Sequence, residues 1–471
     1  MAENAPAKTS AKGWLVFIII FAYSVTVCMG WFNMTGTGVK YVMSGGCFAE
    51  VGGLTAIGYA MSAVSISAIV MAVVAGPLIR AFGGRTTMLI SMVFSIVGVA
   101  IVAASGMNFI MFMAGRVISG CGVGLCGVSC TTLVSLWIAD RQKGLALAIW
   151  GIWVPVGMLI AYNAAIPIIS AVSGVASSEF TTVSYAVACL GYGSASDLGL
   201  SQASIDAVAK ITQGVDVTWW IDVALMVVEA VLCFIVVRDP DESEATEVSA
   251  ERVPYSDPRV MSVIKDYRLW CLCIAWFGFN FANMAFTNNM STWFSLGGFS
   301  WSSDANMVQI ANSVLSACAV IAPFWGIVYD KINKYKKWLF VAFGNCSILL
   351  MCIFGFKAWG DFGFWVYAIF QVLGNSILVA SIRPYVPMLT GKGGATAVSL
   401  GFTLITFLQQ LGNTLSGIAF SAAAGTGSTV EELAFASWVT IVPAAAIAFV
   451  CSLFIRLPKQ AGGKPEGKPQ A

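Results

Sequence analysis

GIVYDKINKYKK, at residues 326–337, and GPLIRAFGGR, at residues 76–85, are two versions of one short pattern. Each begins with a glycine, follows a long apolar run and ends with basic residues just before the next apolar run. Similar segments at corresponding places in the two halves of a chain indicate an internal repeat. We expect each segment to form a tight turn between two helices.

Long apolar runs on both sides of these turns indicate a membrane protein. Of the 471 residues, 58% are hydrophobic and only 10% are charged, whereas charged residues make up about a quarter of an average soluble domain. A helix crosses a hydrocarbon core of roughly 30 Å with about 20 apolar residues. Strands of a membrane barrel would instead alternate apolar and polar residues over about 10 positions. The sequence therefore predicts an all-α integral membrane protein with twelve transmembrane helices, at 14–34, 54–79, 87–104, 109–137, 145–165, 219–237, 270–294, 308–329, 338–356, 362–380, 395–420 and 435–457.

The twelve predicted helices divide into two groups of six. A polar interval that begins with several acidic residues separates them, and such a stretch is typical of a solvated linker. Another interval, at about 166–218, is unusually long, and its second half has too few apolar residues for a span. An ordered cap and a flexible loop both remain open for it. The predicted domains are an N-terminal segment 1–13, a bundle 14–237, a linker 238–269, a second bundle 270–457 and a tail 458–471.

Lysine and arginine are distributed unevenly between the two sides of the membrane. Nearly all 25 lie at the chain ends or in the turns after even-numbered helices, and only Lys40, Lys210 and Lys357 fall on the opposite side. Positively charged segments tend to stay in the cytoplasm. We therefore expect a multi-pass protein of the cell (plasma or inner) membrane with both termini in the cytoplasm.

The two turns resemble the hallmark of the major facilitator superfamily, Gly-x-x-x-Asp-(Arg/Lys)-x-Gly-(Arg/Lys) after helices 2 and 8. In that family the carboxylate helps to hold the cytoplasmic gate. The second copy has it as Asp330, but Arg80 takes its place in the first copy, so the second copy is expected to carry more of the gating. The resemblance implies two pseudo-symmetric six-helix bundles and a gating motif of Gly76, Arg80, Gly83, Arg85, Gly326, Asp330 and Lys331.

Two further segments resemble the same family. Residues 115–122, GRVISGCG, match its Arg-x-x-x-Gly-x-Gly segment in helix 4. Residues 144–157, GLALAIWGIWVPVG, resemble the glycine and proline pattern that bends helix 5. By helix count and topology, the resemblance covers nearly the whole chain.

Arg116 is the clearest ionisable residue inside a predicted helix. A charge in the hydrocarbon core is costly, so it needs a partner, a wet cavity or a function. We expect Arg116 to face the central cavity, where it would bind an anionic group of the substrate or respond to protonation of a nearby carboxylate. The structural alternative is that Arg116 braces helix 4 against helix carbonyls and a neighbouring acid.

Two carboxylates in the sixth predicted helix are candidates for proton coupling. Glu229 lies in the middle of this helix, and Asp222 lies seven residues earlier on roughly the same face. Burial favours the protonated form of a carboxylate, as coupling near neutral pH requires. Alternatively, Glu229 is a neutral structural acid, and Asp222 reaches water or pairs with Lys40. The chain has no histidine, so a proton relay would use carboxylates, tyrosines or water.

Uncharged polar and aromatic residues are frequent in the helices that contact substrate in this family. Asn280, Asn283 and Thr287 follow the i, i+3, i+7 spacing of one helix face, and carboxamides that faced lipid would be costly. We expect them to face the cavity; interhelical hydrogen bonding is the structural alternative. The predicted substrate-binding residues are Tyr23, Asn33, Arg116, Trp150, Trp153, Asn280, Asn283, Gln371, Asn375 and Gln409.

The charge expected in the cavity limits the class of substrate. Aligning the fourth and tenth predicted helices brings Arg116 opposite Gln371, and the seventh, eighth and eleventh predicted helices contain no basic residue. The cavity is thus predicted to be charged in its N-terminal half and neutral in its C-terminal half. A monoanion, or a neutral compound with an aromatic or apolar body, fits a single cation better than a dicarboxylate does.

The leading hypothesis is a secondary active transporter that moves a small organic solute, best a monoanion, by rocker-switch alternating access. Protons are the candidate coupling ion, in symport or antiport. An exporter of amphipathic or aromatic compounds is the closest alternative. A transport-inactive sensor or a membrane enzyme is the alternative from another class, and the absence of histidine and of a nucleophile elbow argues against the enzyme.

The expected partners are the substrate and the lipid bilayer, with no nucleic acid, no metal and no cofactor, and the resemblance implies a functional monomer. The 13 cysteines include no Cys-x-x-Cys pair. This pattern argues against a metal site. Cys47 and Cys189 both fall in predicted outside segments and are a candidate disulfide.

Overall fold

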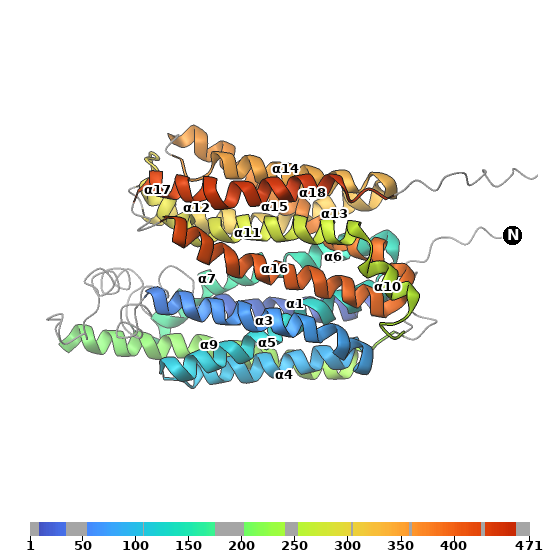
Figure 1. Ribbon diagram of the computed structural model, residues 1–471. Helices are drawn as coiled ribbons and strands as arrows, with labels where there is room; N and C mark the ends of the chain where they lie inside the picture. Colours follow the sequence, from blue (N-terminus) through green and yellow to red (C-terminus); the bar gives the residue numbers. More distant parts are fainter. Residues whose placement is uncertain are drawn as a thin grey trace, which may run out of the picture.

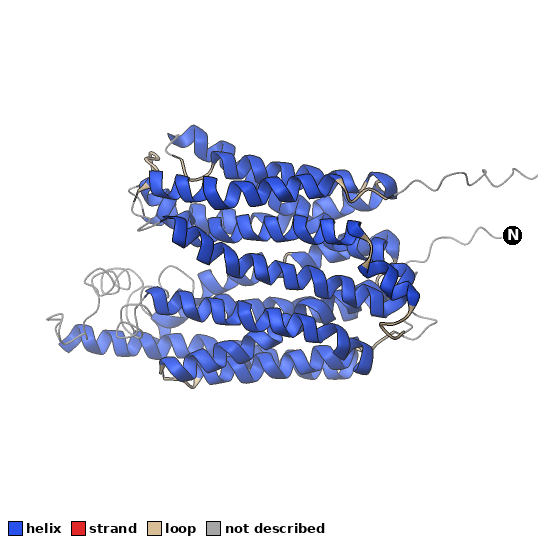
Figure 2. Ribbon diagram, viewed as in Figure 1, coloured by secondary structure: helices blue, strands red, loops and turns tan. Residues whose placement is uncertain are grey.

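The computed structural model describes residues 9–33, 54–106, 108–174, 202–240, 253–302, 305–357, 360–424 and 429–457. Within these ranges the regular structure is entirely helical (Figure 2). Twelve helices in this part of the chain are long and apolar enough to cross a membrane, which confirms the predicted fold class and number of spans. Lys40, Cys47 and Cys189, to which we gave candidate roles, lie outside the described residues.

The helices follow the two predicted groups. The first group contains α1 (Ala11–Phe32), α3 (Leu54–Phe82), α4 (Gly84–Ala103), α5 (Phe109–Trp137), α6 (Asp140–Gly151), α7 (Trp153–Ser173) and α9 (Gln202–Val236). The short α10 (Pro258–Ile264) comes next in the sequence. The second group contains α11 (Tyr267–Leu296), α12 (Ala305–Ser316), α13 (Ala322–Lys331), α14 (Trp338–Phe354), α15 (Gly360–Thr390), α16 (Gly394–Ala424), α17 (Val430–Ala436) and α18 (Val442–Leu453).

The two groups form two bundles that lie side by side, the first below the second in Figure 1. The start of α1 and the end of α18 lie at the same end of the molecule, where α10 also lies (Figure 1). We call this end the terminal side and the other end the opposite side. An even number of spans places both ends of the described chain on one side.

Three of the twelve spans are interrupted. The fifth consists of α6 and α7, separated at Ile152; η3 (Cys318–Ile321) separates α12 from α13, and the π-helical η6 (Ser437–Ile441) separates α17 from α18. A proline lies in the first turn of each following helix, where its missing N–H costs no helical hydrogen bond. These are Pro155, Pro323 and Pro443. The break at Ile152 agrees with the predicted bend of helix 5.

The interval predicted as a long loop at 166–218 is shorter in the structure. α7 continues to Ser173 and α9 begins at Gln202, while 175–201 lie outside the described residues. The second half of the interval has fewer apolar residues than a membrane span, but they recur every three or four positions, as in a helix: Ile205, Val208, Ile211 and Val215. This spacing is compatible with a helix, and in the structure α9 begins at Gln202, before the predicted start of the sixth span.

α15 is also longer than predicted, because it ends at Thr390 rather than at Ala380. Pro384 and Pro387 lie inside it, and in a water-soluble helix such prolines would mark its end. Helices in membranes tolerate proline because neighbouring groups satisfy the backbone carbonyls that it frees. The extension places Arg383, which lies beyond the predicted span 362–380, inside a transmembrane helix.

The glycine-rich segment of α5 brings three helices close together. A Cβ on Gly98 of α4 would overlap the backbone of Ser119, and a Cβ on Gly124 would overlap the backbone of Ala68 in α3. Small residues allow such close approach of helix backbones, which is how membrane helices gain packing energy. The segment that resembles the family motif therefore packs α5 between α3 and α4.

Candidate functional site

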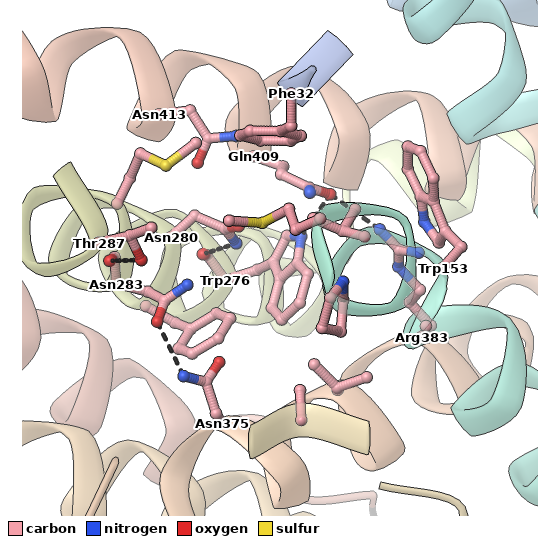
Figure 3. A pocket seen from close by; sticks show the side chains of 18 of the residues that line it. Phe32, Trp153, Trp276, Asn280, Asn283, Thr287, Asn375, Arg383, Gln409 and Asn413 are labelled. Carbon is pink, nitrogen blue, oxygen red and sulfur yellow. Dashed lines mark hydrogen bonds between the residues drawn. The ribbon is translucent and has the colours of Figure 1, made fainter. Parts of the chain in front are cut away.

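A cavity lies between the two bundles, and both contribute to its lining (Figure 3). The first bundle contributes Trp31 and Phe32, at the end of α1, and several residues around the break between α6 and α7. The second contributes side chains of α11, α15 and α16, together with Ala319 of η3. Because α1 starts on the terminal side, its last residues place the cavity between the middle of the molecule and the opposite side.

Arg383 of α15 is the one charged residue among the described residues that line the cavity. It is only 5% exposed. Its Nη2 donates to Gln409 Oε1 at 2.8 Å, and its guanidinium carbon lies 4.4 Å from the ring centroid of Trp150 and 5.6 Å from that of Trp276. Its Nη1 is buried and has no hydrogen-bond partner in the described structure. The cavity lining therefore contains a buried cation of which only Nη2 has a hydrogen-bond partner in the described structure.

Two indole N–H groups add to the donors. Trp153 and Trp31 line the cavity, and Nε1 of each is buried without a partner among the described residues. The Trp153 ring lies 5.5 Å from the Trp150 ring, which in turn lies under the guanidinium of Arg383. Figure 3 shows Trp153 and Arg383 together at one end of the cavity. We call Arg383, Trp153 and Gln409 the cationic end.

Carboxamide side chains gather at the other end (Figure 3). Asn375 Nδ2 of α15 donates to Asn283 Oδ1 of α11 at 2.8 Å. Asn280 Nδ2 donates to the carbonyl of Trp276 in its own helix at 2.7 Å, and Thr287 Oγ1 donates to the carbonyl of Asn283 at 2.9 Å. We call Asn280, Asn283 and Asn375 the carboxamide end.

The structure brings half of the ten predicted substrate-binding residues to the cavity. These are Trp153, Asn280, Asn283, Asn375 and Gln409. Trp150 does not line the cavity but lies directly beneath Arg383, where its Nε1 donates to Ser24 Oγ at 3.0 Å. It therefore supports the cationic end from behind.

Two others lie inside the first bundle. The Tyr23 hydroxyl shares a hydrogen bond of 2.7 Å with the hydroxyl of Ser91 in α4. Asn33, directly after α1, donates from Nδ2 to Thr218 Oγ1 of α9 at 2.7 Å. Both side chains hold helices of one bundle together, and neither lines the cavity.

Arg116 does not line the cavity either, although we expected it to face it. It is 1% exposed, and its guanidinium donates to the carbonyls of Gly30 at 3.0 Å, Trp31 at 2.8 Å and Ala60 at 3.4 Å. Gly30 and Trp31 belong to the last turn of α1, whose carbonyls have no partners within the helix. This is the bracing role that the sequence allowed as an alternative, but with carbonyls and without an ion pair in the described structure.

Gln371 occupies the corresponding place in the second bundle. It is 1% exposed, and its Nε2 donates to the carbonyl of Leu315 in α12 at 3.4 Å. In the first bundle, Nε of Arg116 in α5 likewise donates to the carbonyl of Ala60 in α3. The alignment of the two residues therefore reflects the internal repeat. The charge of the cavity, however, comes from α15 of the second bundle and not from the N-terminal half as predicted.

The candidate coupling residues lie between α1 and α9, outside the cavity lining. Thr26 Oγ1 of α1 donates to Glu229 Oε1 at 2.7 Å, and Glu229 Oε2 is buried without a partner among the described residues. Asp222 is 2% exposed, and its Oδ2 accepts a long hydrogen bond of 3.4 Å from Asn33 Nδ2. Both carboxylates therefore bond to side chains of α1 or of the residue directly after it.

The second gating turn joins the two bundles on the terminal side. Asp330, near the end of α13, accepts hydrogen bonds from the backbone N–H groups of Gly144 at 2.9 Å and Leu145 at 2.8 Å, both in α6. A Cβ on Gly144 would overlap the Asp330 carboxylate, and one on Gly326 would lie 2.8 Å from Ala148 Cβ. The exposed Lys331 ends α13. These glycines are required because α6 and α13 touch.

The first gating turn makes a different contact. Arg80, at the position of the missing acid, lies with its guanidinium carbon 5.5 Å from the ring centroid of Tyr255. A Cβ on Gly76 would lie 3.0 Å from the Tyr255 hydroxyl and 3.1 Å from Thr403 Oγ1 of α16. Tyr255 belongs to the predicted linker, so part of the linker packs where the second turn has its carboxylate.

The remaining residues of the first turn stay within their own bundle. Gly83 has a φ of 91° directly before α4, a backbone conformation that favours glycine. The backbone N–H of Arg85 donates to Asp239 Oδ1 at 3.0 Å, and its Nη2 donates to the carbonyl of Phe234 at 2.7 Å. These bonds fix the turn to the end of α9.

Comparison with known proteins agrees with this architecture. A family model described as "Major Facilitator Superfamily" matches residues 13–417. Solute carrier family 2, facilitated glucose transporter member 10, from Danio rerio is 28% identical over 102 residues, which are 22% of this chain and 20% of that protein. The match therefore spans about a fifth of that relative.

Solved structures match over almost the whole chain. A structure of the E. coli fucose:proton symporter has a TM-score of 0.68 at 13% identity, covering 95% of this chain and 100% of that chain. The human organic anion transporter MFSD10 has a TM-score of 0.64 at 12% identity, covering 94% and 99%. At such low identity these structures show the shared fold alone. With the family match over residues 13–417, they place this chain in the major facilitator superfamily, as a multi-pass membrane transporter rather than an enzyme.

Proposed function

We propose that the chain is a secondary active transporter of a small organic monoanion, which binds at Arg383 in the cavity between the bundles. The observation that carries this proposal is the charge of the cavity. Arg383 is the single charged residue among those described in the lining, and its Nη1 has no protein partner there. A buried cation without a carboxylate is costly in a membrane interior. A bound anion would offset that cost.

The geometry of the cationic end suits one anionic group. Nη1 of Arg383 and Nε1 of Trp153 are both uncommitted donors, and hydrogen bonds from a guanidinium to a carboxylate are stronger than neutral ones. The rings of Trp150 and Trp276 flank the guanidinium and keep water away from it, which strengthens the attraction. With no second cation among the described lining residues, a dianion would keep an uncompensated charge.

The contacts on the terminal side support alternating access. The bundles meet there through Asp330 with α6 and through Gly76 with Thr403. Opening these contacts while the opposite side closes would expose the same cavity to the other side of the membrane. We propose that the terminal side is cytoplasmic, because it carries most of the lysine and arginine among the described residues, and that Glu229 takes up the coupling proton.

The test of the proposal is ligand binding to the purified protein in detergent. A small monocarboxylate should raise the melting temperature of the wild type. Arg383→Gln should weaken its binding about 10-fold to 100-fold, because a hydrogen bond to a charged group contributes roughly 1.5–3 kcal/mol. Arg456→Gln is the matched control, since Arg456 also lies over a tryptophan, 4.0 Å from the Trp338 centroid, but lies outside the cavity.

The apolar lining favours one other candidate function. Phe32, Phe279, Met158 and Met284 also line the cavity, and aromatic and thioether groups suit an exporter of amphipathic compounds. Stabilisation by lipophilic compounds that persists in Arg383→Gln would support the exporter. If, in addition, no monocarboxylate bound the wild type, the monoanion proposal would be contradicted.

A further inference from the structure

The two ends of the cavity present different chemistry to a ligand. At the cationic end, the groups without protein partners are donors: Nη1 of Arg383 and Nε1 of Trp153. The side-chain oxygen of Gln409 is already used, because it accepts from Arg383 at 2.8 Å and from Trp276 Nε1 at 3.2 Å. An acceptor-only group such as a carboxylate satisfies this end fully.

The carboxamide end presents both a donor and an acceptor. Asn283 Oδ1 accepts the hydrogen bond from Asn375. The Nδ2 group of Asn283 therefore remains a donor without a partner in the described structure. Asn280 uses its Nδ2 on the Trp276 carbonyl, so its Oδ1 remains an acceptor. A hydroxyl donates and accepts at once and can serve both atoms. A carboxylate would find no cation and would face an acceptor oxygen, while an alkyl group would leave both polar atoms unpaired.

The distance between the ends matches a small molecule. Asn280 lies four residues beyond Trp276 in α11, about 6 Å along the helix axis at 1.5 Å per residue, and the Trp276 ring lies 5.6 Å from the Arg383 guanidinium carbon. Between the ends, the rings of Trp276 and Phe279 stack with centroids 4.9 Å apart. Figure 3 shows Trp276 between Arg383 and the asparagines. The middle of a ligand would therefore rest on aromatic surface.

We infer that the substrate is a monocarboxylate with hydroxyl groups at the end remote from the carboxylate, that is, a sugar acid or a similar polyhydroxy acid. Its carboxylate accepts from Arg383 and Trp153, its carbon chain packs on Trp276, and its hydroxyls pair with Asn280 and Asn283. This inference rests on the proposed function, in which Arg383 binds the anion, and it adds the chemistry of the other end of the substrate.

Calorimetric titration of the full-length protein in detergent with three six-carbon probes tests the inference. Gluconate has both groups, hexanoate has the carboxylate alone, and glucose has hydroxyls alone. We expect gluconate to bind at least tenfold more tightly than either of the others. This comparison uses only the wild-type protein, so it does not depend on how any variant folds.

Two variants then assign the hydroxyl contacts. Asn280→Leu and Asn283→Leu should each weaken gluconate binding about fivefold to tenfold through the lost hydrogen bond while leaving hexanoate binding unchanged. Asn289→Leu is the matched control: Asn289 lies on the same helix, donates to the Ala285 carbonyl at 2.8 Å and does not line the cavity. Arg383→Gln should weaken both carboxylates and leave glucose unaffected.

The outcomes separate the inference from the proposed function. If hexanoate binds the wild type as tightly as gluconate and Arg383→Gln weakens both, the polyhydroxy inference fails and the monoanion proposal stands. If glucose binds as tightly as gluconate and Arg383→Gln changes neither, both fail. Unchanged gluconate binding in both asparagine variants would also overturn the inference.

Discussion

Arg116 and Arg383 show how the partners of a buried arginine decide its role. Both are almost fully buried inside transmembrane helices. The guanidinium of Arg116 is occupied by backbone carbonyls of α1 and α3, whereas that of Arg383 has one side-chain acceptor and an uncommitted Nη1. An arginine whose three nitrogens all have protein partners stabilises the protein, and one with a nitrogen that has no partner can bind a ligand.

Arg116→Lys should lower the stability of the protein. A lysine ammonium is a point charge and cannot follow the planar arrangement with which Arg116 spans Gly30, Trp31 and Ala60. Loss of one charged hydrogen bond should reduce the free energy of unfolding by roughly 1.5–3 kcal/mol. Thermal unfolding in detergent measures this, with Arg456→Lys as the control. Normal stability together with abolished ligand binding would instead return Arg116 to a binding role.

At the residue scale, the sequence indicated several of the residues that line the cavity, but it did not indicate which groups the buried side chains contact. The asparagines of α11 could be predicted to face a cavity because three polar residues share one helix face. Arg383 was missed because the predicted span ended at Ala380, whereas α15 continues through Pro384 and Pro387. The signal that could have found it is its position three residues beyond the predicted end of a span. Arg116 was placed in the cavity because a helical pattern does not show which carbonyls lie beside a residue.

At the scale of helices and turns, the two turns of the predicted gating motif make contacts on the terminal side by different means. In the second turn a carboxylate bonds to the backbone of α6, and in the first turn Tyr255 of the linker packs against Gly76 and Arg80. Thr396 Oγ1 of α16 also donates to the carbonyl of Val253 at 2.9 Å. The part of the linker that follows residue 252 is therefore attached to the second bundle.

Asp330→Ala should loosen the contact between α6 and α13. Gly144 and Leu145 lose the acceptor of their N–H groups, and a charged hydrogen bond contributes roughly 1.5–3 kcal/mol. Hydrogen exchange of a peptide containing these residues should become about 10-fold to 100-fold faster. The first turn of α4 serves as the internal control, since it does not contact Asp330. Unchanged exchange at Gly144 would show that this carboxylate does not hold the gate.

Tyr255 should act through its ring and not through its hydroxyl. Burial raises the pKa of Tyr255, against the opposing effect of Arg80, so the phenol is protonated at neutral pH, and its hydroxyl is buried without a partner in the described structure. Tyr255→Phe should therefore resemble the wild type. Tyr255→Ala should lose the cation–π contact, about 0.5–1 kcal/mol, and its packing.

The comparison is made by hydrogen exchange at the start of α16, where Thr396 and Thr403 meet the linker and α3. Faster exchange in Tyr255→Ala but not in Tyr255→Phe is the expected result. Equal acceleration in both variants would assign the contact to the hydroxyl and would contradict the cation–π interpretation.

At the scale of the whole molecule, the sequence predicted the number of spans and their grouping, because length and hydrophobicity alone determine whether a helix can cross a membrane. It did not predict the breaks at η3 and η6 or the early start of α9. Those features depend on packing between spans distant in the sequence, such as Gly214 of α9 against Ile169 of α7. Local composition does not carry that information.

The proposed coupling between a proton gradient and transport would be a property of the whole molecule, and a variant of Glu229 tests it. Glu229→Gln keeps the hydrogen bond with Thr26 but cannot release a proton. In proteoliposomes we expect it to abolish uphill accumulation of substrate and to spare exchange of substrate between the two sides. Glu431→Gln is the control, since Glu431 is exposed in α17. Full accumulation in Glu229→Gln would remove this residue from the coupling mechanism.

The break at Ile152 divides the fifth span into two helices, one in contact with Asp330 and one that contributes to the cavity. α6, before the break, carries Gly144 and Leu145, which bond to Asp330 on the terminal side, and α7, after it, begins with Trp153 of the cationic end. Gly151 packs against Val379, one turn from Arg383 on α15. If α6 and α7 turn together, a rotation that breaks the bonds to Asp330 also turns the Trp153 indole relative to Arg383. Opening of the terminal side and weakening of the substrate site at Trp153 and Arg383 would then occur in one step. Substrate release would not require a second, separate conformational change.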